Sequence, residues 1–336
     1  QEDAKKAIAL LKAVPYAVPF SPASGLMAEF HDAGHIIGSA FVSMRWNKSG
    51  VERKIVFSGD LGRYDRPILK NPSLMRDADY LLVESTYGDR LHEQGDPKSE
   101  IKRIINETVQ RRGVVLIPAF AVGRTQELLY TLRELESEGA IPVLPIYVDS
   151  PMAIKATQVY EKHSEIYDRE ASALERKGVD ILQTDRTVFT ESVEESKRVN
   201  ALNDPCIIIS ASGMMTGGRI LHHLKQRLPH EKNAIVFVGY QAEGTRGRAL
   251  QSGNEAVKVH GEQVRSGARI ETISDFSAHA DYREILKWLS GFSAAPKRTF
   301  IVHGEPASSL NLQKEIGEKL GWETYIPVYE ETLTLE

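Results

Sequence analysis

The stretch Ile55-Val56-Phe57-Ser58-Gly59-Asp60-Leu61-Gly62 is the feature around which we predict the fold. Three apolar β-forming residues run into a turn of small residues, so a strand is expected to end just before Asp60. A carboxylate at a strand end is held rigidly, and the glycine beside it lets other groups approach closely. Asp60 therefore either offers two oxygens to hard cations or simply forms a turn or caps a helix.

Length and composition indicate an ordinary globular chain of about two domains. The sequence has 336 residues, of which 41% are hydrophobic and 26% charged, fractions typical of globular proteins. A net charge of −4 argues against a generally basic surface that coats DNA, although a local basic groove remains open. Cys206 is the single cysteine and lies in an apolar run, which excludes internal disulfides and a cysteine-based zinc site. No apolar run approaches the roughly 20 residues that span a membrane, and no signal peptide is visible, so we expect no membrane partner and a cytoplasmic location.

The predicted pattern of helices and strands changes twice along the chain. The first part is rich in strands, with a hairpin between its second and third strands. The middle part alternates helices with buried strands, which is typical of a parallel, doubly wound sheet. The end returns to a mixed pattern. The expected strands are 26–30, 40–46, 54–57, 80–83, 114–118, 141–148, 205–210, 233–238, 269–273 and 299–302, and the expected helices include 101–109, 124–135, 153–177, 281–289 and 310–320.

Five strand ends or turns carry side chains suited to metal binding or acid–base chemistry, each next to a glycine, alanine or serine. Imidazole and carboxylate ligands without thiolate suit Zn2+ or Mn2+ better than a soft metal. A single histidine of this kind is more often a core or surface residue, so the indication of a functional site comes from the five residues taken together. The five residues are His35, Asp60, Glu84, His279 and His303.

The order of five motifs resembles the β-CASP branch of the metallo-β-lactamase superfamily. The motifs are Ala33-Gly34-His35-Ile36-Ile37-Gly38, Ser58-Gly59-Asp60, Glu84-Ser85-Thr86-Tyr87-Gly88, Ser277-Ala278-His279-Ala280-Asp281 and Val302-His303-Gly304-Glu305. The likeness is strongest to the RNA-cleaving members, such as the nuclease subunit of the eukaryotic pre-mRNA 3′-end cleavage factor and its bacterial and archaeal relatives. It implies an α/β fold: a metallo-β-lactamase αββα sandwich with an inserted, doubly wound β-CASP domain. The corresponding domain bounds are 1–88 and 268–336 for the two segments of the sandwich and 89–267 for the insertion.

The resemblance also implies roles for the five residues. By the family pattern, His35 binds metal, Asp60 bridges two zinc ions and His303 binds the second zinc. Glu84 and His279 would form a coupled acid–imidazole pair, in which His279 gives a proton to the leaving oxygen. Asp60, Glu84 and His279 are thus the expected catalytic residues. The alternative for Glu84 is a simple strand-end salt bridge.

The loop from Ser210 to Arg219 is a second candidate site. It follows a buried strand and precedes a helix, so its unpaired backbone N–H groups suit an anion, although it lacks the ending of a Walker loop. In the resembled family this loop borders the nucleic-acid cleft. The candidates for RNA contact are Ser210, Ser212, Gly213, Arg219 and, more weakly, Arg124. The alternative is a tight loop that only packs one domain against the other.

The family's principal metal motif, H-x-H-x-D-H, is absent from these 336 residues. In the family that motif lies upstream of the His35 motif, so it would precede Gln1. The chain is then either an N-terminally truncated piece of an active nuclease or a natural member that lost the motif and became a scaffold. Retention of the five residues and the start at Gln1 favour truncation. We therefore expect the sandwich to be incomplete at its N-terminus and the chain by itself to bind zinc poorly and to be inactive.

The function that the resemblance implies is a zinc-dependent ribonuclease, a metal-dependent RNA phosphodiester hydrolase that holds two Zn2+ ions in the complete protein. It would cut single-stranded RNA endonucleolytically, with metal-activated water, in an interdomain cleft. A 5′-exonuclease activity stays open. The alternatives are a DNA-processing nuclease of the same superfamily and a non-catalytic RNA-binding scaffold subunit. A homodimer is the candidate assembly.

Overall fold

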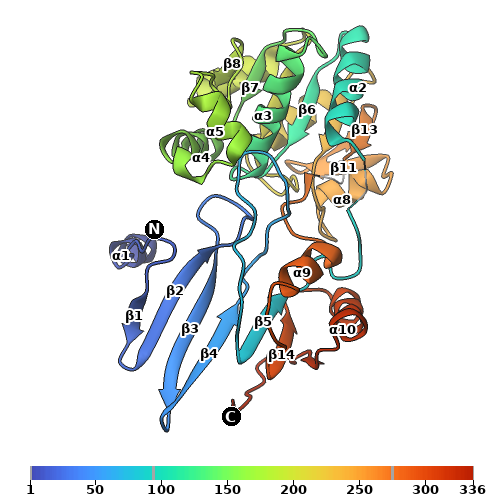
Figure 1. Cartoon of the computed structure of the whole chain (residues 1–336). Coiled ribbons are helices and arrows are strands. Elements are labelled where there is room, and N and C mark those ends of the chain that lie inside the picture. Colours follow the sequence, from blue (N-terminus) through green and yellow to red (C-terminus); the bar gives the residue numbers. More distant parts are fainter. Residues whose placement is uncertain (1, 93–94, 274–275, 336) are drawn as a thin grey trace. The chain divides into compact units, whose positions relative to one another are not determined.

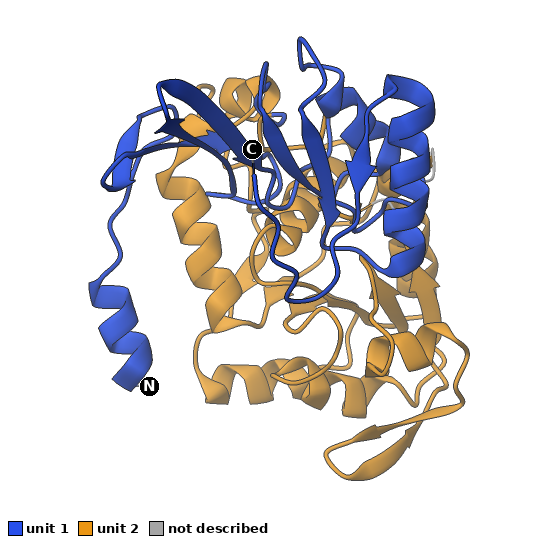
Figure 2. Ribbon diagram, turned by 90° about the horizontal axis from the view of Figure 1, so that it is seen from below, with its two compact units in different colours: residues 1–64, 71–91, 279–336 blue, residues 65–70, 92–278 orange. Residues whose placement is uncertain are grey.

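The structure is a computed structural model that describes residues 2–92, 95–273 and 276–335, and the chain forms two compact units (Figures 1 and 2). Unit 1 comprises residues 1–64, 71–91 and 279–336, and unit 2 comprises residues 65–70 and 92–278. Unit 1 has one main sheet and one hydrophobic core, and unit 2 has its own main sheet with a core on each face. Of the helices that the described ranges contain, none is long and apolar enough to cross a bilayer.

Unit 1 is built on a seven-stranded mixed sheet in the order β1-β2-β3-β4-β5-β14-β15. Strands β1 to β4 pair antiparallel, while β4, β5, β14 and β15 pair parallel. The predicted hairpin is confirmed, since β3 and β4 pair from Val42↔Phe57 to Lys48↔Val51. The strands are β1 Phe20–Ala23, β2 Leu26–Asp32, β3 Ala40–Lys48, β4 Val51–Phe57, β5 Tyr80–Glu84, β14 Arg298–Val302 and β15 Thr324–Tyr325, and the helices are α1 Glu2–Ala9, α9 Tyr282–Leu289 and α10 Pro306–Leu320.

The core of unit 1 lies between one face of this sheet and helices α9 and α10. Alternate strand residues such as Phe41 and Val56 point into it, as the two-residue period of a strand requires. Trp288 of α9 is 1% exposed, packs edge-on against Phe41, and donates its indole N–H to Ser73 O at 2.9 Å. This packing fixes the strand ends that carry the candidate site.

Unit 2 is built on a six-stranded, all-parallel sheet in the order β13-β10-β6-β9-β7-β8. A separate hairpin, β11–β12, pairs antiparallel. The strands are β6 Val115–Pro118, β7 Ile146–Val148, β8 Thr187–Phe189, β9 Ile207–Ser210, β10 Ala234–Phe237, β11 Ala256–Val259, β12 Glu262–Arg265 and β13 Arg269–Thr272. The helices are α2 Pro97–Gln110, α3 Arg124–Ser137, α4 Pro151–Lys162, η1 Ser164–Ile166, α5 Arg169–Glu175, α6 Val193–Ala201, α7 Ile220–Arg227 and α8 Arg246–Gln251.

Two hydrophobic cores cover the two faces of the unit 2 sheet. Leu116 and Ile117 are neighbours in β6, yet Leu116 belongs to the core that contains α7 and Ile117 to the core that contains α3. A strand whose alternate side chains are all apolar is typical of a parallel sheet with helices on both faces. The predicted doubly wound α/β architecture is therefore confirmed.

Three predicted elements differ from the structure. The helix expected over 153–177 ends at Lys162, because His163 leaves the helical conformation and Asp168 caps a new helix by accepting from Ala171 N at 2.7 Å. The strand expected over 141–148 forms only from Ile146, after Pro142 and Pro145, which cannot donate to a ladder.

The third difference concerns β13, which we had assigned to the closing segment of the sandwich, 268–336. It pairs parallel with β10 from Ala234↔Arg269 to Phe237↔Thr272 and so lies in the unit 2 sheet. Unit 2 consequently runs to residue 278, beyond the predicted bound at 267, and also includes the loop Asp65–Lys70. Residues 89–91 lie in unit 1. The domain bounds within the family pattern stay a prediction.

Candidate metal and catalytic site

The end of β4 holds Asp60 in a tight, well-bonded turn. Ser58 N donates to Leu82 O at 2.9 Å, and Ser58 Oγ accepts from Glu84 N at 3.0 Å, so the ends of β4 and β5 are tied together. Gly59 has φ +52°, and a Cβ built on it would lie 3.0 Å from Ala40 O. Glycine is therefore needed here both for its backbone angle and for space.

His35 lies in a turn that is hydrogen-bonded to the same region. Ala33 N donates to Ser39 O at 3.2 Å, and His35 N donates to Ser39 Oγ at 3.1 Å. Gly62 N then donates to Ala33 O at 2.8 Å, which joins this turn to the loop after β4. A Cβ on Gly62 would overlap the carbonyl group of Gly34. The two loops therefore approach each other more closely than any side chain at position 62 allows.

Asp60 faces two different imidazoles with its two oxygens. Its Oδ2 lies 4.0 Å from His35 Nε2, and its Oδ1 lies 3.6 Å from His303 Nδ1. Both distances exceed a hydrogen bond. The Asp60 side chain is 42% exposed, so the carboxylate is open to solvent on its outer side.

Glu84 and His279 form a close pair within unit 1. The Nδ1 atom of His279 lies 3.3 Å from each Glu84 oxygen, and Glu84 Oε1 also accepts from Leu61 N at 2.6 Å. Glu84 is 1% exposed. Burial disfavours its charged form, but hydrogen bonds from His279 and Thr86 outweigh that effect and hold the pKa of the Glu84 carboxyl below its ordinary value. The pair therefore combines a buried carboxylate with a half-buried imidazole.

His303 follows β14 in a conformation that is uncommon for a residue with a side chain. Its φ is +54°, in the left-handed region, and such strain is often found at functional sites. The next residue is a glycine because a Cβ at Gly304 would overlap Ser85. Thr86 Oγ1 lies 3.2 Å from His303 Nδ1 and 3.3 Å from the His303 carbonyl oxygen. These contacts fix the direction of the His303 ring.

The donor atoms of these residues fit a divalent cation site. One set comprises His35, Asp60 and His279, and a second comprises Asp60, Glu84 and His303; within each set one ligand atom per residue lies within 4.8 Å of the others. Two ligands of one tetrahedral zinc ion, each about 2.0–2.1 Å from it, lie roughly 3.4 Å apart. The 3.6 and 4.0 Å separations around Asp60 are close to that value, and the donors are imidazole and carboxylate, as zinc prefers.

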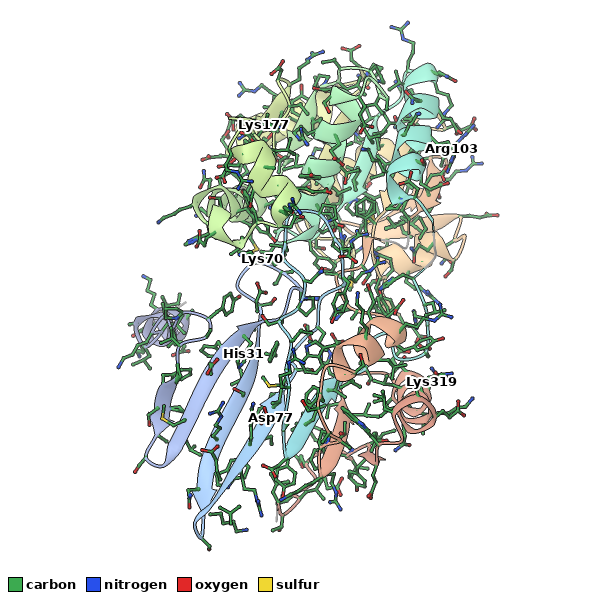
Figure 3. The ribbon with its side chains drawn as sticks, in the orientation of Figure 1. His31, Lys70, Asp77, Arg103, Lys177 and Lys319 are labelled. Carbon is green, nitrogen blue, oxygen red and sulfur yellow. The ribbon has the colours of Figure 1, made fainter. Side chains whose placement is uncertain are left out.

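The five predicted site residues lie close together in unit 1, and Thr86, to which the sequence prediction gave no role, lies beside them. It also donates its backbone N–H to Glu84 Oε2 at 3.3 Å, so it contacts both halves of the site. A hydroxyl two residues after a strand-end carboxylate is the signal that would have indicated it. His31, in β2 of the same unit, has its Nε2 3.0 Å from Ser43 Oγ (Figure 3).

The candidate RNA-contact residues of unit 2 are already engaged within that unit. Ser210 is 1% exposed, and its hydroxyl donates to Asp149 O at 2.9 Å. Ser212 Oγ lies 3.0 Å from Thr216 Oγ1 and accepts from Thr216 N, so it closes the loop. Arg124 is 8% exposed and pairs with Glu127. These contacts favour structural roles, and a phosphate contact by these residues stays a prediction.

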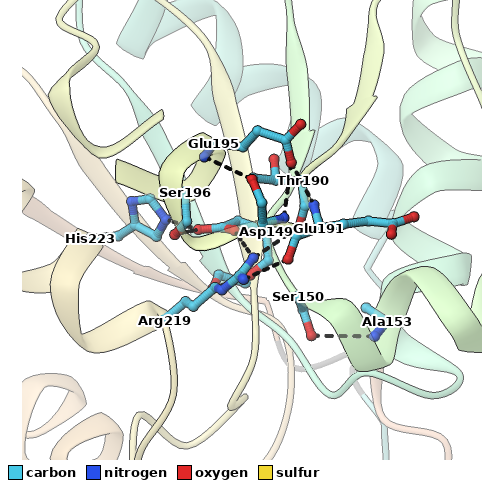
Figure 4. A network of polar contacts seen from close by, with 11 residues as sticks. Asp149, Ser150, Ala153, Thr190, Glu191, Glu195, Ser196, Arg219 and His223 are labelled. Carbon is cyan, nitrogen blue, oxygen red and sulfur yellow. Dashed lines mark hydrogen bonds and ion pairs between the residues drawn. The ribbon is translucent and has the colours of Figure 1, made fainter. Parts of the chain in front are cut away.

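A buried polar network holds Arg219 in unit 2 (Figure 4). Its guanidinium donates to Asp149 Oδ1 at 2.8 Å and to the carbonyls of Thr190 and Glu191 at 2.9 and 2.7 Å. The other oxygen of Asp149 lies 2.6 Å from His223 Nε2 and accepts from Ser196 Oγ at 2.6 Å. Asp149 and His223 are both 0% exposed.

The charges in this network are set by its hydrogen bonds. Burial opposes ionisation of Asp149, but the hydrogen bonds from His223 and Ser196 prevail and lower the pKa of the Asp149 carboxyl. Burial also lowers the pKa of His223, with only partial compensation by Asp149. The sequence reasoning missed this network. A carboxylate directly after the strand Ile146–Val148 repeats the Asp60 pattern and was the available signal.

Comparisons with known proteins agree with this fold. Residues 125–250 match the Beta-Casp domain, and residues 263–327 match the Zn-dependent metallo-hydrolase RNA specificity domain. These two matches define a metallo-β-lactamase fold with an inserted β-CASP domain.

Several known proteins match nearly the whole of this chain and indicate its family more closely. Ribonuclease TTHA0252 of Thermus thermophilus is 38% identical over 314 residues, which cover 93% of this chain and 70% of that protein. An RNase J-like protein of Methanocaldococcus jannaschii is 30% identical, with 98% and 75% covered, and transcription termination factor FttA of the same organism is 31% identical, with 94% and 51% covered. The chain therefore spans about half the length of FttA. It belongs to the β-CASP family of metallo-β-lactamase-fold RNA nucleases.

Proposed function

We propose that this chain belongs to a zinc-dependent ribonuclease that hydrolyses phosphodiester bonds of single-stranded RNA. The observation that carries the proposal is the position of Asp60, whose two oxygens face His35 and His303 at 4.0 and 3.6 Å. A carboxylate between two imidazoles at these separations suits a bridge between two cations. The relatives named as ribonucleases support RNA as the substrate.

In this proposal the five residues have separate tasks. His35 and His303 would each hold one zinc ion, and Asp60 would bridge the two. When bound, paired cations supply Lewis acidity that neutralises the phosphodiester charge and activates water. His279 keeps its Nδ1 against the Glu84 carboxylate, so its Nε2 is the atom that would give a proton to the leaving oxygen. The buried carboxylate orients the ring and stabilises its protonated form.

The count of ligands bears on the activity of the chain by itself. With Glu84 and His279 reserved for proton transfer, the described residues supply one imidazole and a shared carboxylate per ion, while zinc normally takes at least three protein ligands. We therefore propose that residues 1–336 alone bind zinc weakly and are inactive. Elemental analysis should find well under two zinc ions per chain. A version extended upstream by an H-x-H-x-D-H segment should bind two. Two stoichiometric ions on the shorter chain would refute this assignment of ligands.

Two variants separate the metal ligands from the proton donor in the extended version. His279→Ala should slow RNA cleavage while zinc is retained, because His279 is assigned to proton transfer. His303→Ala should lose both cleavage and zinc. Loss of zinc in His279→Ala would instead make His279 a ligand, as the set with His35 and Asp60 permits.

Matched single-stranded RNA and DNA oligonucleotides test the substrate. We expect cleavage of RNA within the strand, and end-labelled substrates will show whether 5′-exonucleolytic products also appear. Preference for DNA would favour the alternative of a DNA-processing nuclease. The shortage of ligands favours a second candidate, a non-catalytic RNA-binding scaffold, which predicts RNA binding without cleavage even in the extended version. A homodimer stays a prediction for light scattering to test.

A further inference from the structure

Phe120 is a large apolar side chain that unit 2 leaves exposed at the carboxyl end of β6. It is 47% exposed, whereas its neighbours Ala119 and Ala121 are 1% and 7% exposed. The ring therefore projects outward from an otherwise buried segment. Exposed single apolar residues are common, so the surroundings of the ring decide whether this one has a use.

The backbone around Phe120 is firmly held. Its carbonyl oxygen accepts from Thr125 N at 3.2 Å and from Thr125 Oγ1 at 2.8 Å, and Ala119 N donates to Ser210 O at 3.1 Å. The ring also packs against the loop after β9, where a Cβ on Gly213 would lie only 3.1 Å from Phe120 Cδ2. Glycine at 213 thus lets the loop contact the ring from one side. A side chain held in this way is presented to a ligand at low entropic cost.

Phe120 lies just beyond the carboxyl end of β6, which is where ligands of this kind of sheet usually bind. Strands β10, β6 and β9 are adjacent and parallel, and ligands of open α/β sheets bind outside the carboxyl ends of the strands. The loop after β9 lies at this edge and is closed by the 3.0 Å contact between Ser212 Oγ and Thr216 Oγ1. Gln241, in the loop after β10, donates to Gly213 O at 3.0 Å and joins the two loops. Tyr240, which precedes Gln241 in the sequence, is a second exposed aromatic residue and is 38% exposed.

Positive charge lies on the other side of the same loop. The Arg246 guanidinium donates to the carbonyls of Met215, Thr216 and Lys258 at 3.0, 3.2 and 2.6 Å. Carbonyl oxygens satisfy its hydrogen bonds without cancelling its charge. An open cavity of about 380 Å3 adjoins this arginine, and its lining mixes polar residues such as Thr216 and Lys258 with apolar ones such as Val257. The loop that contacts the Phe120 ring at Gly213 thus carries a positive charge at its other end, which favours an anionic ligand.

We propose that Phe120 is a stacking platform for a base of single-stranded RNA, with the adjoining phosphates running over the 212–216 loop toward Arg246. The inference rests on the proposed function, since it names how that substrate is held. Stacking on an aromatic ring needs an unpaired base and tolerates any sequence, because every base has a π-face. Binding by this surface is thus selective for single strands and indifferent to sequence.

The test measures binding and needs no cleavage. Residues 1–336 are titrated, in the presence of a chelator, into a fluorescently labelled single-stranded RNA, and the anisotropy gives the dissociation constant. Phe120→Ala should weaken binding by about 5- to 150-fold, the range found for loss of one base–aromatic stack. Phe120→Trp should bind as tightly as the natural chain. Val143→Ala, at a 57% exposed position just before β7, is the matched control and should bind unchanged.

Two further measurements keep the inference separate from general damage to the protein. An RNA that carries abasic nucleotides should bind the natural chain as weakly as ordinary RNA binds Phe120→Ala, and Phe120→Ala should not distinguish the two RNAs. The salt dependence of binding should keep its slope in Phe120→Ala, since no phosphate contact is removed. Equal affinity of Phe120→Ala and the natural chain overturns the stacking site but leaves the proposed function standing. Absence of RNA binding by the unaltered residues 1–336 also overturns the stacking site, whereas the proposed function is tested separately by RNA cleavage in the extended version.

Discussion

The Asp149 network gives the sharpest prediction for stability. Asp149 is fully buried and its two oxygens receive three donors, from Arg219 at 2.8 Å and from His223 and Ser196 at 2.6 Å each. In Asp149→Asn an amide N–H2 must face at least one of these donors, and the Arg219 charge loses its carboxylate. Removing one partner of a buried ion pair costs about 3–5 kcal/mol. Because Arg219 is 19% exposed and keeps two carbonyl partners, we expect the lower end, about 3 kcal/mol.

Urea unfolding followed by circular dichroism measures this loss of unfolding free energy. A loss of about 3 kcal/mol is a large part of the roughly 5–15 kcal/mol that stabilises a typical domain. The matched control is Glu271→Gln, which removes the carboxylate from the exposed Arg103–Glu271 pair and should cost less than about 1 kcal/mol. Replacing Arg219 by Met in the Asp149→Asn background should restore part of the loss, because the uncompensated charge is gone. A loss below about 1 kcal/mol in Asp149→Asn would show that the network does not stabilise the fold.

Three other predictions concern acidity, loop contact and ring orientation. Burial lowers the pKa of His223 below its ordinary 6.5, so on acidification this side chain takes up a proton in the unfolded chain before it does so in the folded one. The unfolding free energy should therefore fall as the pH drops below about 6.5. Urea midpoints measured against pH should show this fall, and His223→Gln should reduce it. Gly62→Ala should lower the unfolding free energy by about 3 kcal/mol through its overlap with Gly34, whereas the control Gly317→Ala, in an open helical position, should raise it by about 1 kcal/mol. In the version extended upstream by an H-x-H-x-D-H segment, Thr86→Val should weaken zinc binding about tenfold in a competition titration with a chelator, because the hydroxyl that orients the His303 ring is lost, and unchanged affinity would remove Thr86 from the site.

The five candidate site residues could be singled out from the sequence because they lie at strand ends or in turns, within motifs whose order resembles that of a known family. His35, Asp60, Glu84 and His303 each follow or precede a strand that the apolar pattern predicted, and glycines mark the close approaches. Strand ends on one edge of a sheet converge, so side chains far apart in sequence meet there.

The features that the sequence did not reveal depend on partners rather than on local pattern. The strand Arg269–Thr272 was predicted, but nothing in its residues says that it pairs with β10 and not with the sheet of unit 1. Likewise, nothing in the sequence around His223 indicates its partner Asp149, which lies 74 positions away. Pairing of this kind is decided by tertiary packing, which a two-residue or 3.6-residue period does not encode.

Asp60 and Asp149 show why a strand-end carboxylate alone does not indicate a metal. Both follow a short apolar strand, yet Asp149 is fully buried and its oxygens are saturated by donors at 2.6–2.8 Å. Those distances are hydrogen bonds and leave no room for a cation. Asp60 is 42% exposed and faces imidazoles at 3.6 and 4.0 Å, which is too long for a hydrogen bond and close to the separation of two ligands on one ion. The distance between carboxylate and imidazole, together with access from solvent, therefore separates the two roles that the sequence pattern leaves open.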